Sequence, residues 1–215
     1  MSDDNDNSAL RDLDWLLNRM RPLLAEFHAI IDRAFADDPA MHGWRATDFA
    51  LDVETGAIRP RLTGVPEGHG VHPDHPRYWM PARRPTVELA ARTLAHRSRR
   101  FDGHRVMPVD ADWKDDLRAQ HPGMFECEMS VGSGWADLIR AYVEMRGERG
   151  EVPRFVQIKE KFGSLRLYES GMSSGLQQIA DHLSMCICEE CGAPGELRAG
   201  GWVRTLCDDH AERRR

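Results

Sequence analysis

The sequence predicts an α+β fold with a helical N-terminal part, small antiparallel hairpins and a C-terminal module built on cysteine and histidine. Three observations support this. Several segments repeat apolar residues at helical intervals. Two segments alternate apolar and polar residues on both sides of a glycine. Near the end of the chain, Cys188, Cys191, Cys207 and His210 form a C-x2-C, C-x2-H array.

Composition divides the chain into three parts. The polar residues 1–7 are expected to form a disordered tail, residues 8–185 an α+β globular domain, and residues 186–215 a metal-binding module. Prolines and glycines concentrate between residues 56 and 85, which predicts a loop region inside the globular domain. With 215 residues, the chain is long enough to bury a substantial core.

Nothing in the sequence predicts a membrane protein. No apolar run approaches the roughly 20 residues of a membrane span, and the acidic start MSDDNDNS differs from a secretory signal. Four of the five cysteines fall between residues 186 and 207, a distribution typical of metal binding in a reducing compartment. We therefore expect a cytoplasmic protein.

In the N-terminal half, apolar residues recur at helical spacing from residue 8 to residue 34, where Pro22 either kinks one helix or opens a second. Alternating residues ahead of Gly56 predict a hairpin ending at about residue 62. Thr86 is expected to cap a helix running to about residue 100, with its arginines facing outward.

Two more helices are predicted before the main hairpin. Asp110 is expected to cap a short helix that bears Trp113 and Leu117. Ser133 is expected to cap a strongly amphipathic helix that stops near Gly147.

The segment at 155–169, FVQIKEKFGSLRLYE, alternates on both sides of Gly163 and predicts a second hairpin. Its core face is expected to carry Val156, Ile158, Leu165 and Leu167. Its other face is expected to carry Gln157, Lys159, Arg166 and Tyr168. A helix between residues 176 and 187 then leads to the first paired cysteines.

Three thiolates and an imidazole at the C-terminal spacing can surround one Zn²⁺ tetrahedrally. Gly192 permits a knuckle after the first pair, two short strands follow about Gly200, and Cys207 and His210 share one face of a helix. This order resembles the treble-clef zinc finger. A zinc ribbon is the competing interpretation, but the second pair lacks a knuckle glycine. Cys186 is a neighbour able to compete for one coordination position.

A filled Cys3His shell leaves no position for substrate, so the sequence predicts a structural zinc. A second metal is an alternative use of the loop that contains His69, His72 and His75, and it would support nuclease or hydrolase chemistry. The competing interpretation is a solvated loop, because loop ligands lack fixed spacing.

Charge is distributed unevenly along the chain. The net charge of −6 argues against general coating of nucleic acid, yet residues 77–105 hold eight arginines while residues 1–40 hold nine acids. The two segments either neutralise each other, which we favour, or leave a basic patch.

Two groups of residues are candidates for binding a partner. Arg97, Arg99 and Arg100, within an arginine-rich segment from 83 to 105, suit phosphate contacts or a solvated helix face. Lys159, Arg166 and Tyr168 place cations and an aromatic ring on one sheet face. This second face suits a partner protein as well as a nucleic acid.

The C-terminal third also contains a specific set of motifs. In order they are Gly134-Trp135 with Leu138-Ile139, VQIKEKFGSLRLY at 156–168, CEECGAPGELR at 188–198 and GWVRTLCDDH at 201–210. In these motifs the chain resembles a family of uncharacterised proteins from bacteriophages and bacterial mobile elements. The resemblance implies a zinc site and a phage or mobile-element origin, but no reaction.

Together these observations predict a non-enzymatic zinc-containing protein that docks on a macromolecular partner, with protein favoured over nucleic acid. An inhibitor or adaptor of a host or defence protein is the role expected by analogy. The alternatives are a nucleic-acid-binding zinc finger that uses the arginines of 83–105 and a metal-dependent nuclease that uses the histidine loop.

Overall fold

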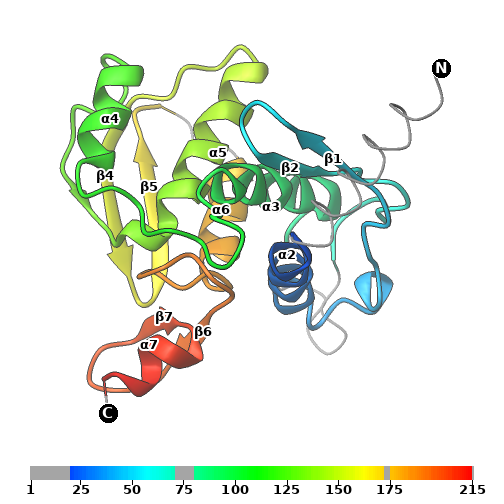
Figure 1. The fold of residues 1–215 in the computed structure, drawn as a ribbon. Coiled ribbons are helices and arrows are strands. Elements are labelled where there is room, and N and C mark those ends of the chain that lie inside the picture. The colour runs from blue at the N-terminus through cyan, green and yellow to red at the C-terminus, as the bar shows by residue number, and fades with distance from the viewer. Residues whose placement is uncertain (1–19, 71–79, 172–174, 215) are drawn as a thin grey trace, which may run out of the picture.

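The structure, a computed structural model, describes residues 20–70, 80–171 and 175–214 and is organised around one central helix, α3 (Arg83–Ser98) (Figure 1). Helix α2 (Arg21–Ala34), helix α5 (Ala136–Glu148), helix α6 (Gly175–Ser184) and the first hairpin all contact α3. Apolar residues on several sides of α3 are buried, including Val87, Leu89 and Leu94. Its buried residues also include Thr86, Thr93 and Arg97, so the burial of α3 extends beyond its apolar stripe.

The N-terminal half confirms the expected second helix and the first hairpin. Helix α2 begins at Arg21 with Pro22 in its first turn, where a missing N–H costs nothing. A short 3-10 turn, η1 (Pro39–Met41), follows. Strands β1 (Phe49–Asp52) and β2 (Ala57–Pro60) then pair antiparallel. The predicted tail at 1–7 and the predicted helix from residue 8 to residue 19 lie outside the described residues.

One expectation about this half was wrong in detail. Helix α3 starts at Arg83, three residues before the expected cap, and the Thr86 hydroxyl donates instead to the carbonyl of Ala82 at 2.8 Å. Strand β2 lies within the hairpin that the sequence predicts up to about residue 62.

A three-stranded sheet forms the second part of the fold, in the order β3-β4-β5. Strand β3 (Met129–Ser130) lies parallel to β4 (Phe155–Lys161), which pairs antiparallel with β5 (Ser164–Glu169). The β4–β5 hairpin confirms the prediction, whereas β3 was not foreseen because two residues carry no periodic signal. Helix α6 packs against β5.

The register of β4 corrects one predicted face. Ile158, Leu165 and Leu167 are buried as expected, but Val156 is 59% exposed. A register shift between Phe155 and Gln157 turns Phe155 into the core instead. Such a bulge reverses the alternation that the sequence predicts.

The sequence predicted the presence of these helices correctly but not the residues at which they begin. Helix α4 (Trp113–Gln120) buries Trp113 and Leu117 as expected, but the residue before it is Asp112, not Asp110. Ser133 opens a 3-10 turn, η2 (Ser133–Trp135), that leads into α5, and its hydroxyl donates to the carbonyl of Glu190 at 3.2 Å. The polar side chain thus serves a tertiary contact rather than a cap.

The chain ends in a small module at the far end of the β4–β5 hairpin from α4 (Figure 1). Strands β6 (Glu196–Arg198) and β7 (Arg204–Leu206) form an antiparallel hairpin, and α7 (Asp208–Glu212) follows directly. The predicted C-terminal hairpin and helix are therefore confirmed. Among the described residues, no helix combines the length and apolar character needed to cross a membrane.

Candidate metal centre

Cys188, Cys191, Cys207 and His210 converge at one point of the C-terminal module, with their ligand atoms all within 4.8 Å of one another. The Sγ atoms of Cys191 and Cys207 are 3.8 Å apart, and Nδ1 of His210 lies 3.6 Å from Sγ of Cys188. A tetrahedral shell with Zn–S bonds of about 2.3 Å and a Zn–N bond of about 2.0 Å requires S···S and S···N separations of about 3.8 Å and about 3.5 Å. The second S···N separation, from Cys207 to His210, is 3.1 Å. The four side chains can therefore hold one metal ion.

The first two ligands lie on a tight turn that follows α6. Gly192 adopts a φ of 77°, and its N–H donates to the carbonyl of Cys188 at 2.8 Å. Hydrogen bonds from the Cys191 thiol and from nearby backbone N–H groups lower the pKa of Cys188 below that of an ordinary thiol. The deprotonated thiolate is the form of cysteine that binds a metal cation.

Cys186 lies outside this cluster. Its side chain is buried, and desolvation raises the pKa of its thiol to about 12. A neutral thiol in apolar surroundings behaves as a small apolar side chain. The structure thus separates Cys186 from the four ligands, although the C-x-C spacing left that question open.

The metal-binding turn is fastened to the main domain by very close backbone packing. A Cβ atom placed on Gly134 would lie 2.1 Å from the carbonyl oxygen of Cys188, and the N–H of Gly134 donates to Glu189 at 2.9 Å. Trp135 is fully buried and donates through Nε1 to the carbonyl of Ile187 at 2.9 Å. The start of α5 and the metal-binding turn therefore form one packed unit.

The β4–β5 turn is fastened to the same module from the other side. The Thr205 hydroxyl donates to the carbonyl of Gly163 at 2.6 Å. The Glu160 carboxylate accepts from the N–H of Gly163 at 2.6 Å and from Nε1 of Trp202 at 3.1 Å. These contacts hold Phe162, at the tip of β4–β5, near Trp202 of the β6–β7 hairpin.

The arginines expected on the outside of α3 have specific partners within the chain. Arg97 is only 5% exposed, pairs with Glu26 at 2.7 Å and donates to the carbonyl of Cys191 at 2.6 Å. Arg100 pairs with Asp137. Arg99 is exposed and contacts His96 at 3.4 Å. Three candidates that are adjacent in sequence thus occupy three different environments.

This pairing supports mutual neutralisation over a basic patch on α3. Arg83 binds Asp38 at 2.6 Å, and Arg97 binds Glu26, so both join the arginine-rich segment to the acidic one. Arg92 binds Glu148 at 2.6 Å. The nucleic-acid hypothesis loses most of the free cations that motivated it.

Of the three candidate residues on the β4–β5 hairpin, Lys159 and Tyr168 contact each other, whereas Arg166 pairs with another element. Nζ of Lys159 lies 5.3 Å from the ring centroid of Tyr168, a cation–π contact. Arg166 is directly opposite Lys159 in the register but forms an ion pair with Asp181 of α6. Lys159 and Tyr168 remain available to a ligand, whereas Arg166 is engaged.

The predicted histidine loop is not assembled into a site by the described residues. His69 forms an isolated bridge with Ala82, whereas His72 and His75 lie outside the described residues. In the part of the chain that the structure describes, the C-terminal cluster is the one group with the ligands and separations for a metal ion.

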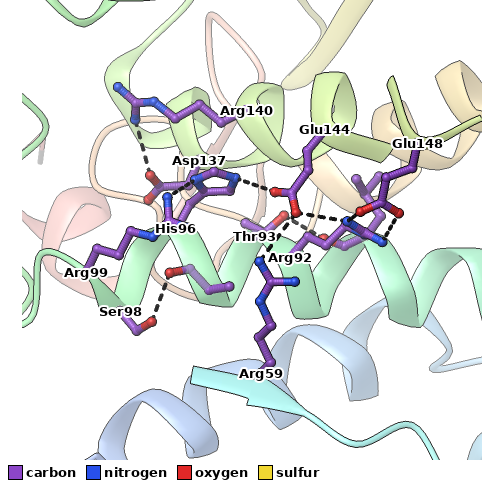
Figure 2. A network of polar contacts seen from close by, with 12 residues as sticks. Arg59, Arg92, Thr93, His96, Ser98, Arg99, Asp137, Arg140, Glu144 and Glu148 are labelled. Carbon is purple, nitrogen blue, oxygen red and sulfur yellow. Dashed lines mark hydrogen bonds and ion pairs between the residues drawn. The ribbon is translucent and has the colours of Figure 1, made fainter. Parts of the chain in front are cut away.

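Sequence reasoning missed two features that the fold creates. One is a polar network between α3 and α5 that contains His96 and Glu144 (Figure 2). These residues are 48 positions apart, so no local pattern connects them. The other is the pair of exposed aromatic residues, Phe162 and Trp202. Their position beside glycines in two predicted turns was a usable signal, because turn residues are seldom buried.

Comparison with known protein families, characterised proteins and solved structures finds no match to this chain.

Proposed function

We propose that the chain is a non-enzymatic zinc protein of the cytoplasm whose metal centre supports a docking surface for a partner protein. The Cys3His set favours zinc, because thiolate and imidazole ligands at tetrahedral separations suit this ion. The turn supplies Cys188 and Cys191, and the start of α7, after the β6–β7 hairpin, supplies Cys207 and His210, which is the order of a treble clef. Four protein ligands fill a tetrahedral shell, which favours a structural role for the ion.

The observation that carries the proposal is an exposed apolar surface built jointly by two hairpins. We call Phe162, Leu197 and Trp202 the aromatic surface. Phe162 is 69% exposed and Trp202 is 71% exposed, and together they line a hollow of about 530 Å³. Large apolar side chains gathered in one exposed place indicate an interaction site, and aromatic residues are enriched at protein interfaces.

The surroundings of the aromatic surface favour a protein over a nucleic acid. Lys159 and Lys161 border the hollow, but Glu160 lies between them and binds Trp202. A carboxylate in the lining of the hollow repels a phosphate backbone, and the net charge of −6 adds to this. An apolar segment flanked by acidic residues matches the apolar hollow and its two lysines.

The biological setting in this proposal rests on the resemblance in the C-terminal motifs. A small protein of phage or mobile-element origin that docks on a host or defence protein would act as an inhibitor or an adaptor. The proposal requires no reaction at the metal, because a closed shell must lose a ligand before a substrate can bind.

A capture experiment with matched variants tests the proposal. The wild type, a Phe162→Asn/Trp202→Ala variant and a Val152→Ser control are immobilised and exposed to the same nuclease-treated lysate. Asparagine tolerates the φ of 55° at position 162, and Val152 is an exposed apolar residue outside the aromatic surface. Metal analysis of each preparation should find one zinc per chain.

The expected result is one stoichiometric protein captured by the wild type and by Val152→Ser but not by the double variant. Capture that is equal for all three proteins would contradict the docking surface. Recovery of nucleic acid alone from an untreated lysate would favour the nucleic-acid alternative.

A further inference from the structure

A hollow of about 480 Å³ lies between α3, α4 and α5, away from the metal centre. The lining comes from α3 and the residues just after it (His96, Arg99, Arg100), from the end of α4 (Gln120, His121) and from α5 (Asp137, Arg140, Glu144). Basic side chains from three elements thus face one space. The partners of most of them are drawn in Figure 2.

The lining of the hollow carries one more positive than negative charge. Its arginines are Arg99, Arg100 and Arg140, and its carboxylates are Asp137 and Glu144. A local excess of this sign inside a hollow concentrates anions.

His96 is held in one tautomer by its two neighbours. A guanidinium only donates, so the 3.4 Å contact with Arg99 makes Nδ1 of His96 an acceptor. Nε2 then carries the proton and donates to Glu144 at 2.9 Å (Figure 2). The hydrogen bond from His96, together with Arg92 and Arg59, lowers the pKa of Glu144 to about 2. His96 therefore holds the Glu144 side chain in place at the edge of the hollow and contributes no negative charge of its own.

Two arginines in this wall, Arg99 and Arg140, have N–H groups available to a ligand. Arg99 forms no ion pair with a carboxylate anywhere in the described chain, and its side chain is exposed. Arg140 contacts Asp137 at 3.3 Å, a long ion pair that leaves its other N–H groups available. These arginine N–H groups could donate hydrogen bonds to a ligand that carries several acceptor oxygen atoms.

We propose that this hollow binds the phosphate group of a phosphomonoester. Guanidinium groups match the oxygen geometry of phosphate, and hydrogen bonds between charged groups are the strongest available. The volume exceeds that of a phosphate and leaves room for part of the attached molecule. The proposal concerns binding of the phosphate group alone and includes no transfer step.

The test is a titration of the isotope-labelled protein, followed by NMR, at constant ionic strength. The probes are inorganic phosphate and phenyl phosphate, and the readouts are the imidazole signals of His96 and His121. Arg99→Gln removes one charge from the hollow. Arg149→Gln removes the same charge at the exposed end of α5, outside the lining, and serves as the matched control.

Both probes are expected to saturate the signals of the wild type, with phenyl phosphate binding at least as tightly. Arg99→Gln should weaken binding roughly tenfold while the fold, followed by circular dichroism, stays unchanged. Arg149→Gln should leave binding unchanged. Shifts that never saturate, equal weakening by both variants, or binding of inorganic phosphate alone would each overturn the proposal. None of these outcomes bears on the aromatic surface.

Discussion

Replacing Gly134 with alanine tests whether the metal-binding turn and the main domain form one packed unit. The new Cβ would lie 2.1 Å from the carbonyl oxygen of Cys188, 2.6 Å from the carbonyl carbon of Glu189 and 2.7 Å from the backbone nitrogen of Gly192. All three neighbours are backbone atoms, so no side chain can rotate away. Restoring an ordinary contact of about 3.4 Å requires the two backbones to separate by about 1.3 Å.

That separation would break the hydrogen bond from Gly134 to Glu189 and strain the one from Trp135 to Ile187. Overpacking costs roughly 1–3 kcal/mol, and each lost hydrogen bond costs about 1 kcal/mol more. We expect the free energy of unfolding to fall by about 3–5 kcal/mol. In a chain of this size, the melting temperature should fall by roughly 10 °C.

Chemical denaturation of Gly134→Ala and Gly147→Ala, side by side, measures the effect. Gly147 lies inside α5, and a Cβ added there would meet nothing within 4 Å, so alanine should stabilise the helix by up to about 1 kcal/mol. The two substitutions are chemically identical and differ only in their surroundings. If Gly134→Ala proved as stable as the wild type, the packing argument would be wrong.

Three further predictions concern the metal, a buried ion pair and pH. Cys207→Ser should lose the single bound metal in elemental analysis, whereas Cys186→Ser should keep it, because only the first is in the cluster. Arg97→Met should lower the free energy of unfolding by roughly 2–4 kcal/mol by leaving a carboxylate and a carbonyl unpaired, while Arg99→Met should change it by less than about 0.5 kcal/mol. The pKa of Glu144 falls from 4.5 unfolded to about 2 folded, so its contribution is complete above pH 4.5 and is lost as the pH falls toward 2. Denaturation curves of Glu144→Gln should therefore depend less on pH in that window than those of the wild type.

The sequence predicts elements well where a periodic pattern is long. Helix α6 and the β4–β5 hairpin follow directly from their apolar spacing, and the four ligands follow from chemistry that needs a fixed interval. Strand β3 has two residues, and its pairing with β4 depends on contacts far along the chain. No local pattern of that length identifies a strand.

Local rules failed where a tertiary contact decided the outcome. Val156 fits the alternation for a core position, but a bulge turns it outward. Ser133 fits a helix cap, but its hydroxyl bonds the metal-binding turn. Arg97 fits a solvated helix face, but it reaches a carbonyl of the same turn. In each case a partner distant in sequence outweighs a preference that the residue has alone.

The hydroxyl of Thr205 has a consequence for how this protein would behave when its ion is scarce. Thr205 holds the turn that presents Phe162, and it precedes the ligand Cys207 by only two residues. Loosening the ligands therefore loosens the threonine, and with it the placement of the aromatic side chains. Under the proposed function, docking at the aromatic surface would then depend on metal supply, and intact chains without the ion would not bind.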